Sequence, residues 1–176
     1  MKIAYITTGE ARFLDVIKDA VTLVITNNFH SSVVQFCKRE GIRCRILDHE
    51  LYASRDEHEL AIKDILDKAG IDLVILGSYR RIIKNIDFLK QYSGKIINIH
   101  LSYLPEFPGE RAWEKVFLAG TKESGYTLHY VDTGIDTGKI IFQERVNIEE
   151  CKNSQEVYDK LVEATCIGLR KVIENL

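Results

Sequence analysis

The sequence lacks the features that mark several large classes of protein. It has two prolines and 11 glycines in 176 residues, and no Pro- or Gly-rich linker, repeat or low-complexity tract divides it. No apolar run approaches the ~20 residues that span a membrane. Residues 1–10 carry no long apolar run behind Lys2, so we interpret them as a first strand and not as a signal peptide. We therefore expect one domain over residues 1–176, located in the cytoplasm.

Charge and cysteine content exclude further classes. The net charge is -2 and the sequence pI is about 6.2, so no basic field points to nucleic acid. The four cysteines have neither close pairing nor metal-ligand spacing, which predicts reduced structural thiols and no metal site. The first apolar run is followed by TTGEAR at 7–12, which contains neither a G-x-G-x-x-G fingerprint nor a P-loop. A nucleotide-dependent oxidoreductase is thus suggested by fold class alone.

Apolar runs alternate with amphipathic stretches along the chain. Strands of continuous apolar character separated by helices are typical of a parallel sheet covered on both faces. We expect such strands at residues 2–7, 21–26, 44–47, 72–76 and 95–101. Helices are expected at 12–20, from Ser31 or Ser32 to near Gly41, and from Ser54 to Gly70. Runs 127–131 and 139–148 predict an added antiparallel pair, and 154–175 a final helix. The predicted class is α/β: a Rossmann-like, mostly parallel sheet with helices on both faces and an antiparallel C-terminal strand pair.

Three polar residues stand where such a sheet has its active site, at the carboxyl ends of the strands. Asn98 and His100 are two apart at the end of the fifth predicted strand, so their side chains project to the same side. Asp136 lies in a turn between Gly134 and Gly138. An amide donor, an imidazole and a carboxylate suit acyl transfer, in which one group stabilises an oxyanion and the others manage a proton.

A structural explanation stands beside the catalytic one. An Asn-x-His at a strand end is often a satisfied turn or cap, and an Asp in a Gly-rich turn is usually hydrogen-bonded to its own backbone. Spacing permits catalysis here but does not require it.

A family resemblance rests on these residues. Segment 98–109, NIHLSYLPEFPG, followed by DTGIDTG at 132–138, resembles the signature of the folate-dependent formyltransferases. That family includes glycinamide ribonucleotide, methionyl-tRNA and amino-sugar N-formyltransferases. The resemblance also takes in the first strand, Ser54-Arg55, segment 70–83 and the final helix. The length is similar to that of the small glycinamide ribonucleotide enzyme and leaves no room for the extra domain of the tRNA enzyme.

The resemblance implies roles for the three polar residues. Asn98 and His100 would bind the oxyanion that forms when a primary amine attacks the formyl carbon of 10-formyltetrahydrofolate, a cosubstrate. Asp136 would orient His100 and a water and assist loss of the ammonium proton. If Asp136 holds His100 protonated, the imidazolium is a better oxyanion partner than neutral imidazole.

The resemblance also implies folate contacts. The stretch after the fourth predicted strand would supply backbone hydrogen bonds and an apolar wall for the pterin ring, with the turn near Asp136 covering its other edge. The residues implied are Arg81, Ile82 and Ile83, with Thr133, Gly134 and Ile135. The alternative is that the isoleucines belong to the core and the arginines to a solvated face.

The amine side departs from the family pattern. Glycinamide ribonucleotide enzymes carry a Gly- and Ser/Asn-rich phosphate loop after the first strand, of which this chain keeps Gly9. Glu10 would repel a phosphate, and Arg12 would compensate as a side-chain ligand. Arg55, Lys160 and Glu163 match family positions near the phosphate and ribose, although each is also an ordinary surface charge.

The sequence therefore predicts a formyltransferase whose partner is a small, phosphorylated amine, with glycinamide ribonucleotide in purine biosynthesis the leading acceptor. An amino-sugar nucleotide or another specialised amine is the alternative acceptor. Other readings are a hydrolase, in which water replaces the amine, and a non-catalytic folate-binding homologue. No nucleic acid or membrane partner is expected, and the oligomeric state does not follow from the sequence.

Overall fold

The computed structural model describes residues 1–175, which form two compact units, Met1–Ile97 and a second unit that begins at Asn98. The strands are hydrogen-bonded in the order β3-β2-β1-β4-β5-β6-β7. This is the mostly parallel α/β sheet with an antiparallel C-terminal pair that the sequence predicts. The expectation of a single domain stays a prediction. None of the helices within residues 1–175 has both the length and the apolar character that a membrane span requires.

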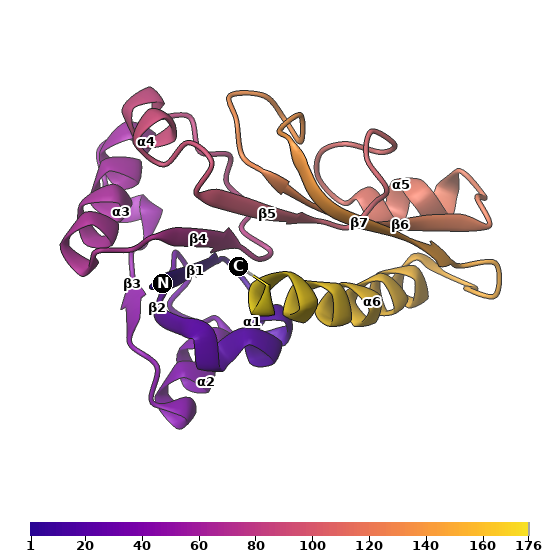
Figure 1. Cartoon of the computed structure of the whole chain (residues 1–176), viewed down its shortest axis with the longest axis horizontal. Helices are drawn as coiled ribbons and strands as arrows, with labels where there is room; N and C mark the ends of the chain where they lie inside the picture. The colour runs from indigo at the N-terminus through magenta and orange to yellow at the C-terminus, as the bar shows by residue number, and fades with distance from the viewer. Residues whose placement is uncertain (176) are drawn as a thin grey trace. The chain divides into compact units, whose positions relative to one another are not determined.

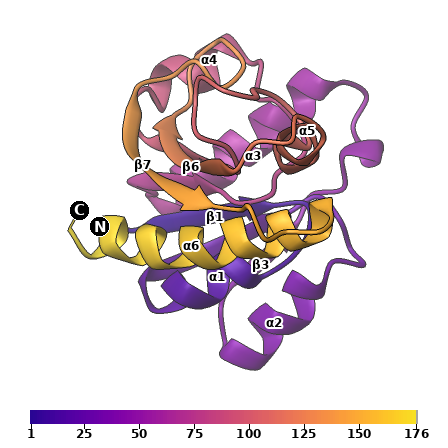
Figure 2. The same cartoon turned by 90° about the vertical axis from the view of Figure 1, so that its right-hand side faces the viewer.

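The first unit is a parallel sheet with helices on both faces. Strand β1 pairs in parallel with β2 and β4, and β2 pairs in parallel with β3. Helices α1 and α2 lie on one face, and α3 and α4 on the other (Figures 1 and 2). The strands are β1 (Ile3–Thr7), β2 (Val21–Thr26), β3 (Cys44–Ile46) and β4 (Leu73–Leu76). The helices are α1 (Arg12–Ile17), α2 (Ser32–Glu40), α3 (Arg55–Ala69) and α4 (Ile86–Gln91), with short 3-10 turns at Lys18–Ala20 and His49–Leu51.

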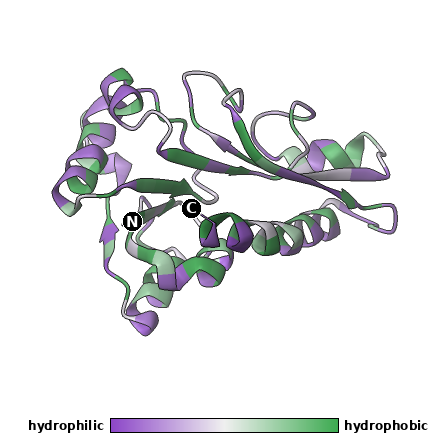
Figure 3. Ribbon diagram, viewed as in Figure 1, coloured by the Kyte–Doolittle hydropathy of each residue, from purple (hydrophilic) through white to green (hydrophobic). Residues whose placement is uncertain are grey.

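Local chemistry sets the helix ends in this unit. The Ser31 hydroxyl accepts a hydrogen bond from the amide of Val33 at the start of α2, and the Ser54 hydroxyl does the same for α3. Gly41 and Gly70 adopt the left-handed conformation that ends these helices. All residues of β1 and β4 are buried, and the apolar colour of these strands is visible in Figure 3.

Strand β5 (Ile96–His100) leads into the second unit, in which β6 (Glu123–Tyr130) pairs antiparallel with β7 (Ile140–Asn147). Helix α6 (Ser154–Glu174) packs against both strands and against α5 (Ala112–Leu118). Gly168 permits close packing, because a Cβ there would lie 2.0 Å from the hydroxyl of Tyr126. Trp113 packs on Tyr158 with ring centroids 5.0 Å apart.

Three elements differ from the sequence expectations. Helices α4 and α5 were not predicted; the first has six residues and the second begins only after Arg111 in the left-handed conformation. Strand β6 begins at Glu123, four residues before the predicted start at 127. Its first residues, Glu-Ser-Gly, have low strand propensity, and the pairing with β7 overrides it.

Candidate active site

The end of β5 presents Asn98 and His100 to the same carboxylate. The Nδ2 atom of Asn98 donates to Oδ1 of Asp136 over 3.3 Å, and Nδ1 of His100 lies 3.4 Å from Oδ2. Both His100 and Asp136 are largely buried, with 8% and 12% of their side chains exposed. The intervening Ile99 is buried in the core. The spacing argument for Asn98 and His100 therefore gives the right geometry.

The turn that carries Asp136 uses its two aspartates differently. Asp132 caps the turn by accepting from the amide of Gly134 over 2.9 Å and from the hydroxyl of Thr137 over 2.8 Å. Asp136, in the left-handed conformation with φ 54°, instead accepts from Gly109 and Asn98 outside the turn. The ordinary turn role thus falls to Asp132, and the Asp136 carboxylate points into the polar cluster.

A fourth member of the cluster, His129, was missed from the sequence. Its Nε2 lies 3.2 Å from Nδ2 of Asn98 and 3.4 Å from Oδ1 of Asp136, and its side chain is 3% exposed. Its Nδ1 faces the carbonyl of Tyr130 at 2.9 Å, so Nδ1 carries the hydrogen and Nε2 accepts from Asn98. These two acceptors fix the orientation of the Asn98 amide. The available signal was the period of two in β6, which places His129 on one face with Thr127.

Electrostatics set the protonation of the cluster. Burial alone would raise the pKa of Asp136, but the neighbouring imidazoles of His129 and His100 and the hydrogen bond from the Gly109 amide together lower this pKa to about 2. Burial lowers the pKa of His100 below its usual range, against the opposing effects of Asp136 and the Phe107 carbonyl. His100 is therefore neutral at pH 7 in the free protein, with its Nε2 hydrogen donated to Phe107 O at 3.0 Å. Its Nδ1 carries the lone pair, and the imidazolium considered from the sequence would have to form during the reaction.

The loop after β1 differs from a phosphate loop in detail. The amide of Gly9 donates to the hydroxyl of Thr7 over 3.0 Å and so is already used within the protein. A Cβ at Gly9 would meet nothing within 4 Å, so packing does not require glycine there. Arg12 pairs with Glu10 at 3.0 Å on the surface. The first helix passes through a 3-10 turn, Lys18–Ala20, directly into β2.

The stretch after β4 divides the residues expected to bind folate. Ile83 is buried in the core, as the structural alternative proposed, while Ile82 is 42% exposed. Arg81 is half-buried, and its Nε atom is buried with no hydrogen-bond partner among the described residues. The buried carboxylate of Glu59 holds the end of this segment by accepting from the amides of Lys84 and Asn85 over 2.8 and 2.6 Å.

The remaining predicted site residues are distributed over both units. Arg55 is the exposed first residue of α3 in the first unit. In the second unit, Lys160 is half-buried and Glu163 exposed, three residues apart on α6. The turn residues Thr133, Gly134 and Ile135 are exposed, and Ile135 is the most exposed apolar side chain of that turn at 54%.

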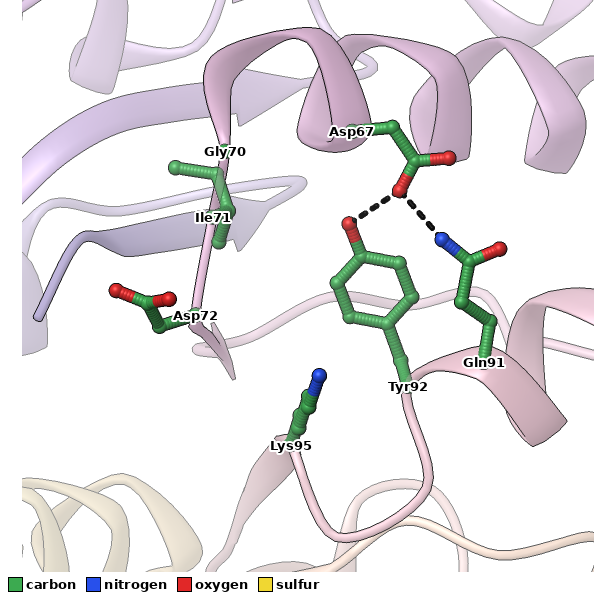
Figure 4. Close-up of a pocket in the computed structure, with 7 residues that line it drawn as sticks. All are labelled: Asp67, Gly70, Ile71, Asp72, Gln91, Tyr92 and Lys95. Carbon is green, nitrogen blue, oxygen red and sulfur yellow. Dashed lines mark hydrogen bonds between the residues drawn. The ribbon is translucent and has the colours of Figure 1, made fainter.

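A separate hollow of about 390 Å³ lies in the first unit at the amino ends of β4 and β5 (Figure 4). Figure 4 shows Tyr92 and Gln91 directed at Asp67, whose carboxylate accepts from them over 2.8 and 2.7 Å. Lys63 pairs with the second oxygen of Asp67 at 2.8 Å. These groups join α3 to the end of α4, so we assign the hollow a structural role.

Comparison with known proteins agrees with the geometry. The family model described as formyl transferase matches residues 1–173. The solved structure of phosphoribosylglycinamide formyltransferase from Streptococcus pneumoniae superposes with a TM-score of 0.94 at 32% identity, covering 99% of this chain and 97% of that one. The formyltetrahydrofolate deformylase of Escherichia coli is 32% identical over 137 residues, which are 78% of this chain and 48% of that protein.

Other relatives are much longer. The trifunctional purine biosynthetic protein adenosine-3 of Gallus gallus is 35% identical over 144 residues, or 82% of this chain. The chain spans only 14% of the length of that protein. Since the family model accounts for nearly all of the described residues, the chain belongs to the formyl transferase family.

Proposed function

We propose that this chain transfers the formyl group of 10-formyltetrahydrofolate to the primary amine of glycinamide ribonucleotide. The observation that carries the proposal is the buried cluster of Asn98, His100 and Asp136, in which an amide donor and an imidazole converge on one ionised carboxylate. The likeness to a phosphoribosylglycinamide formyltransferase over nearly the full length of both chains supports it.

The chemistry follows from the polar atoms of the cluster. The amine nitrogen attacks the formyl carbon, and the carbonyl electron pair moves to oxygen to give an oxyanion. Asn98 shares an Nδ2 hydrogen with that oxyanion, a kind of contact whose removal costs ~10²–10³ in rate. Nδ1 of His100 takes the surplus proton of the attacking amine, directly or through a water, and the Asp136 carboxylate at 3.4 Å stabilises the imidazolium. The imidazolium also stabilises the oxyanion. The electron pair of the oxyanion then re-forms the carbonyl as the bond between the formyl carbon and the nitrogen of tetrahydrofolate breaks, and His100 gives its proton to that nitrogen.

The donor assignment rests on family membership and on two exposed apolar side chains. Ile82 and Ile135 are 42% and 54% exposed, so each offers apolar surface that suits contact with the ring of a folate. We propose Ile82 and Arg81 as side-chain contacts and the backbone of the buried Ile83 as a further contact of the first unit. Ile135, Thr133 and Gly134 are the contacts proposed for the second unit.

The acceptor assignment rests on the relatives and on cationic side chains. We propose that Arg12, Arg55 and Lys160 supply the charge that binds a phosphate, since the Gly9 amide is already used. We place Glu163 beside Lys160 as the contact for the sugar. An amino-sugar nucleotide remains the alternative acceptor, and the cytoplasmic location expected from the sequence remains a prediction.

Hydrolysis is the second candidate, because a formyltetrahydrofolate deformylase is similar to this chain. Water would take the place of the amine at the same cluster. The two reactions differ in their products, which are a formamide in one and free formate in the other.

The test is a transfer assay that follows tetrahydrofolate release from 10-formyltetrahydrofolate with glycinamide ribonucleotide, with amino-sugar nucleotides, or with no amine. Release that depends on glycinamide ribonucleotide supports the proposal. Tetrahydrofolate release that requires an amino-sugar nucleotide would change the acceptor. If tetrahydrofolate is released equally fast without any amine, and formate is the second product, the reaction is hydrolysis. If folate binds and no condition releases product, the chain is a non-catalytic folate-binding homologue. Asn98→Ala is the control, since it removes the oxyanion donor from the cluster.

A further inference from the structure

Lys115 of helix α5 contacts the loop at residues 107–109, whose backbone is hydrogen-bonded to the catalytic cluster. The Nζ atom of Lys115 donates to the carbonyl of Pro108 over 2.7 Å. The ammonium also covers the next residue, since a Cβ at Gly109 would lie 3.5 Å from Nζ. Lys115 is exposed, and this hydrogen bond is the contact that its ammonium makes with the loop.

The loop contacts the cluster through neighbouring backbone groups. The carbonyl of Phe107 accepts from Nε2 of His100 over 3.0 Å, and the amide of Gly109 donates to Oδ2 of Asp136 over 2.7 Å. The carbonyl held by Lys115 belongs to the residue between them. One side chain thus fixes the peptide that links the backbone partners of His100 and Asp136.

The conformation of this loop requires support. Phe107 has φ 52°, in the left-handed region that is unfavourable for a bulky residue, and Gly109 has φ 82°. Ser102 holds one side of the loop, since its hydroxyl donates to the carbonyls of Glu106 and Phe107. Lys115 holds the other side at Pro108. Without Lys115 the Pro108 carbonyl loses its side-chain donor.

We propose that Lys115 is a positioning residue for formyl transfer: by holding the Pro108 carbonyl it fixes the Phe107 and Gly109 backbone groups that orient His100 and Asp136. This inference rests on the proposed function for its kinetic consequence. It extends that function to a residue that touches neither substrate nor reacting atoms.

The charge of Lys115 gives the proposal a second, independent readout. The groups that face His100 within the second unit are Asp136, His129, Lys115 and the Phe107 carbonyl. Burial lowers the pKa of His100 most, and the positive charge of Lys115 lowers it further. Removing that charge therefore raises the pKa of His100, a change that can be measured without turnover.

The experiment compares three variants at Lys115. Lys115→Met removes both donor and charge, Lys115→Gln keeps a donor without charge, and Lys115→Arg keeps both. A misplacement of a catalytic group by ~1 Å can cost up to ~10²-fold in rate. We therefore expect Lys115→Met to lower kcat about 10-fold, with little change in the KM for the folate or the KM for the amine. Gln should restore much of kcat but not the His100 pKa, and Arg should restore both. The His100 pKa is measured by NMR titration of the free protein.

Lys122→Met is the matched control, because Lys122 is an exposed lysine of the same unit that pairs with Glu149 at 2.6 Å, in contact with neither His100 nor Asp136. A Lys115→Met protein with wild-type kcat would overturn the proposal, as would a kcat loss equal to that of Lys122→Met. If the wild-type protein transfers no formyl group, the proposed function fails, and the NMR titration alone decides whether Lys115 acts on His100.

Discussion

Asp136 accepts a hydrogen bond from Asn98 over 3.3 Å, although 38 residues separate the two in the chain. The other oxygen of the carboxylate accepts from the Gly109 amide over 2.7 Å. The strand, the loop after it and the Gly-rich turn thus meet at one carboxylate. That carboxylate is the group on which the geometry of the cluster depends.

Replacing Asp136 by Asn should lower kcat by about 10²–10³, because the amide cannot stabilise the imidazolium that His100 becomes. Circular dichroism should show the wild-type fold. Asp132→Asn is the matched control in the same turn, since an asparagine oxygen still accepts from Gly134 and Thr137. Comparable turnover in wild type and Asp136→Asn would remove Asp136 from the mechanism.

Acid stability should report the same carboxylate. The pKa of Asp136 is about 2 in the folded protein and ~3.9 in an unfolded chain. A lowered folded pKa stabilises the protein above the unfolded value, and this contribution is lost as the pH falls through the folded one. The gap in unfolding free energy between wild type and Asp136→Asn should therefore shrink by about 1 kcal/mol from pH 6 to pH 3. Urea unfolding at the two pH values measures it; a constant gap would contradict the assigned pKa.

The pH dependence of kcat/KM for formyl transfer should report the protonation of His100. If Nδ1 of His100 accepts the amine proton, kcat/KM falls on the acid side as His100 becomes protonated. Since burial lowers the pKa of His100, this limb should lie below the ~6.5 of an unperturbed histidine. In Asp136→Asn the limb should move to still lower pH, because the carboxylate raises that pKa. A limb in Asp136→Asn at or above the wild-type position would exclude His100 as the titrating group.

The sequence predicts the sheet and the pairing of Asn98 with His100 because both follow from short-range periodicity. Strands β1, β2 and β4 are mostly apolar runs, and the period of two puts Asn98 and His100 on one side. Ser54 and Gly70 mark the ends of α3 through local capping alone. Each of these features depends on residues within a few positions of one another.

The parts that the sequence does not predict depend on distant partners. His129 joins the cluster through Asn98, which is 31 residues away. The period of two in β6 places His129 on one face of the strand but does not reveal this distant partner. In the sequence, Lys115 looks like an ordinary lysine on the surface of a helix. Only the structure shows that its ammonium donates to the Pro108 carbonyl. The amide of Gly9 donates to the hydroxyl of Thr7 and not to a ligand. A sequence motif does not show that a nearby side chain accepts this hydrogen bond.

The loop after β1 gives a test of the phosphate hypothesis. If Arg12 binds the acceptor phosphate, Arg12→Ala should raise the acceptor KM by about 10-fold, the loss of one charge-assisted contact. Glu10→Gln should lower that KM, because it removes the carboxylate that pairs with Arg12 at 3.0 Å. The KM for the folate should not change in either protein. Arg39→Ala serves as the control, as Arg39 pairs with Glu40 on α2. Acceptor KM values that match the wild type in both variants would show that the phosphate binds elsewhere.

Substituting two exposed isoleucines of one segment tests whether Ile82 contacts the folate specifically or only contributes exposed apolar surface. Ile82 and Ile86 are 42% and 50% exposed, four residues apart, and only Ile82 falls in the stretch assigned to the pterin ring. Covering the exposed part of one isoleucine with a ligand contributes about 1 kcal/mol, so Ile82→Ser should raise the Kd for folate about fivefold. Ile86→Ser should leave the Kd unchanged, because its side chain lies at the start of α4. Calorimetric titration of a stable folate analogue into both proteins measures the difference. Equal effects of the two substitutions would show that the segment responds to lost apolar surface and that Ile82 is no specific contact for the ring.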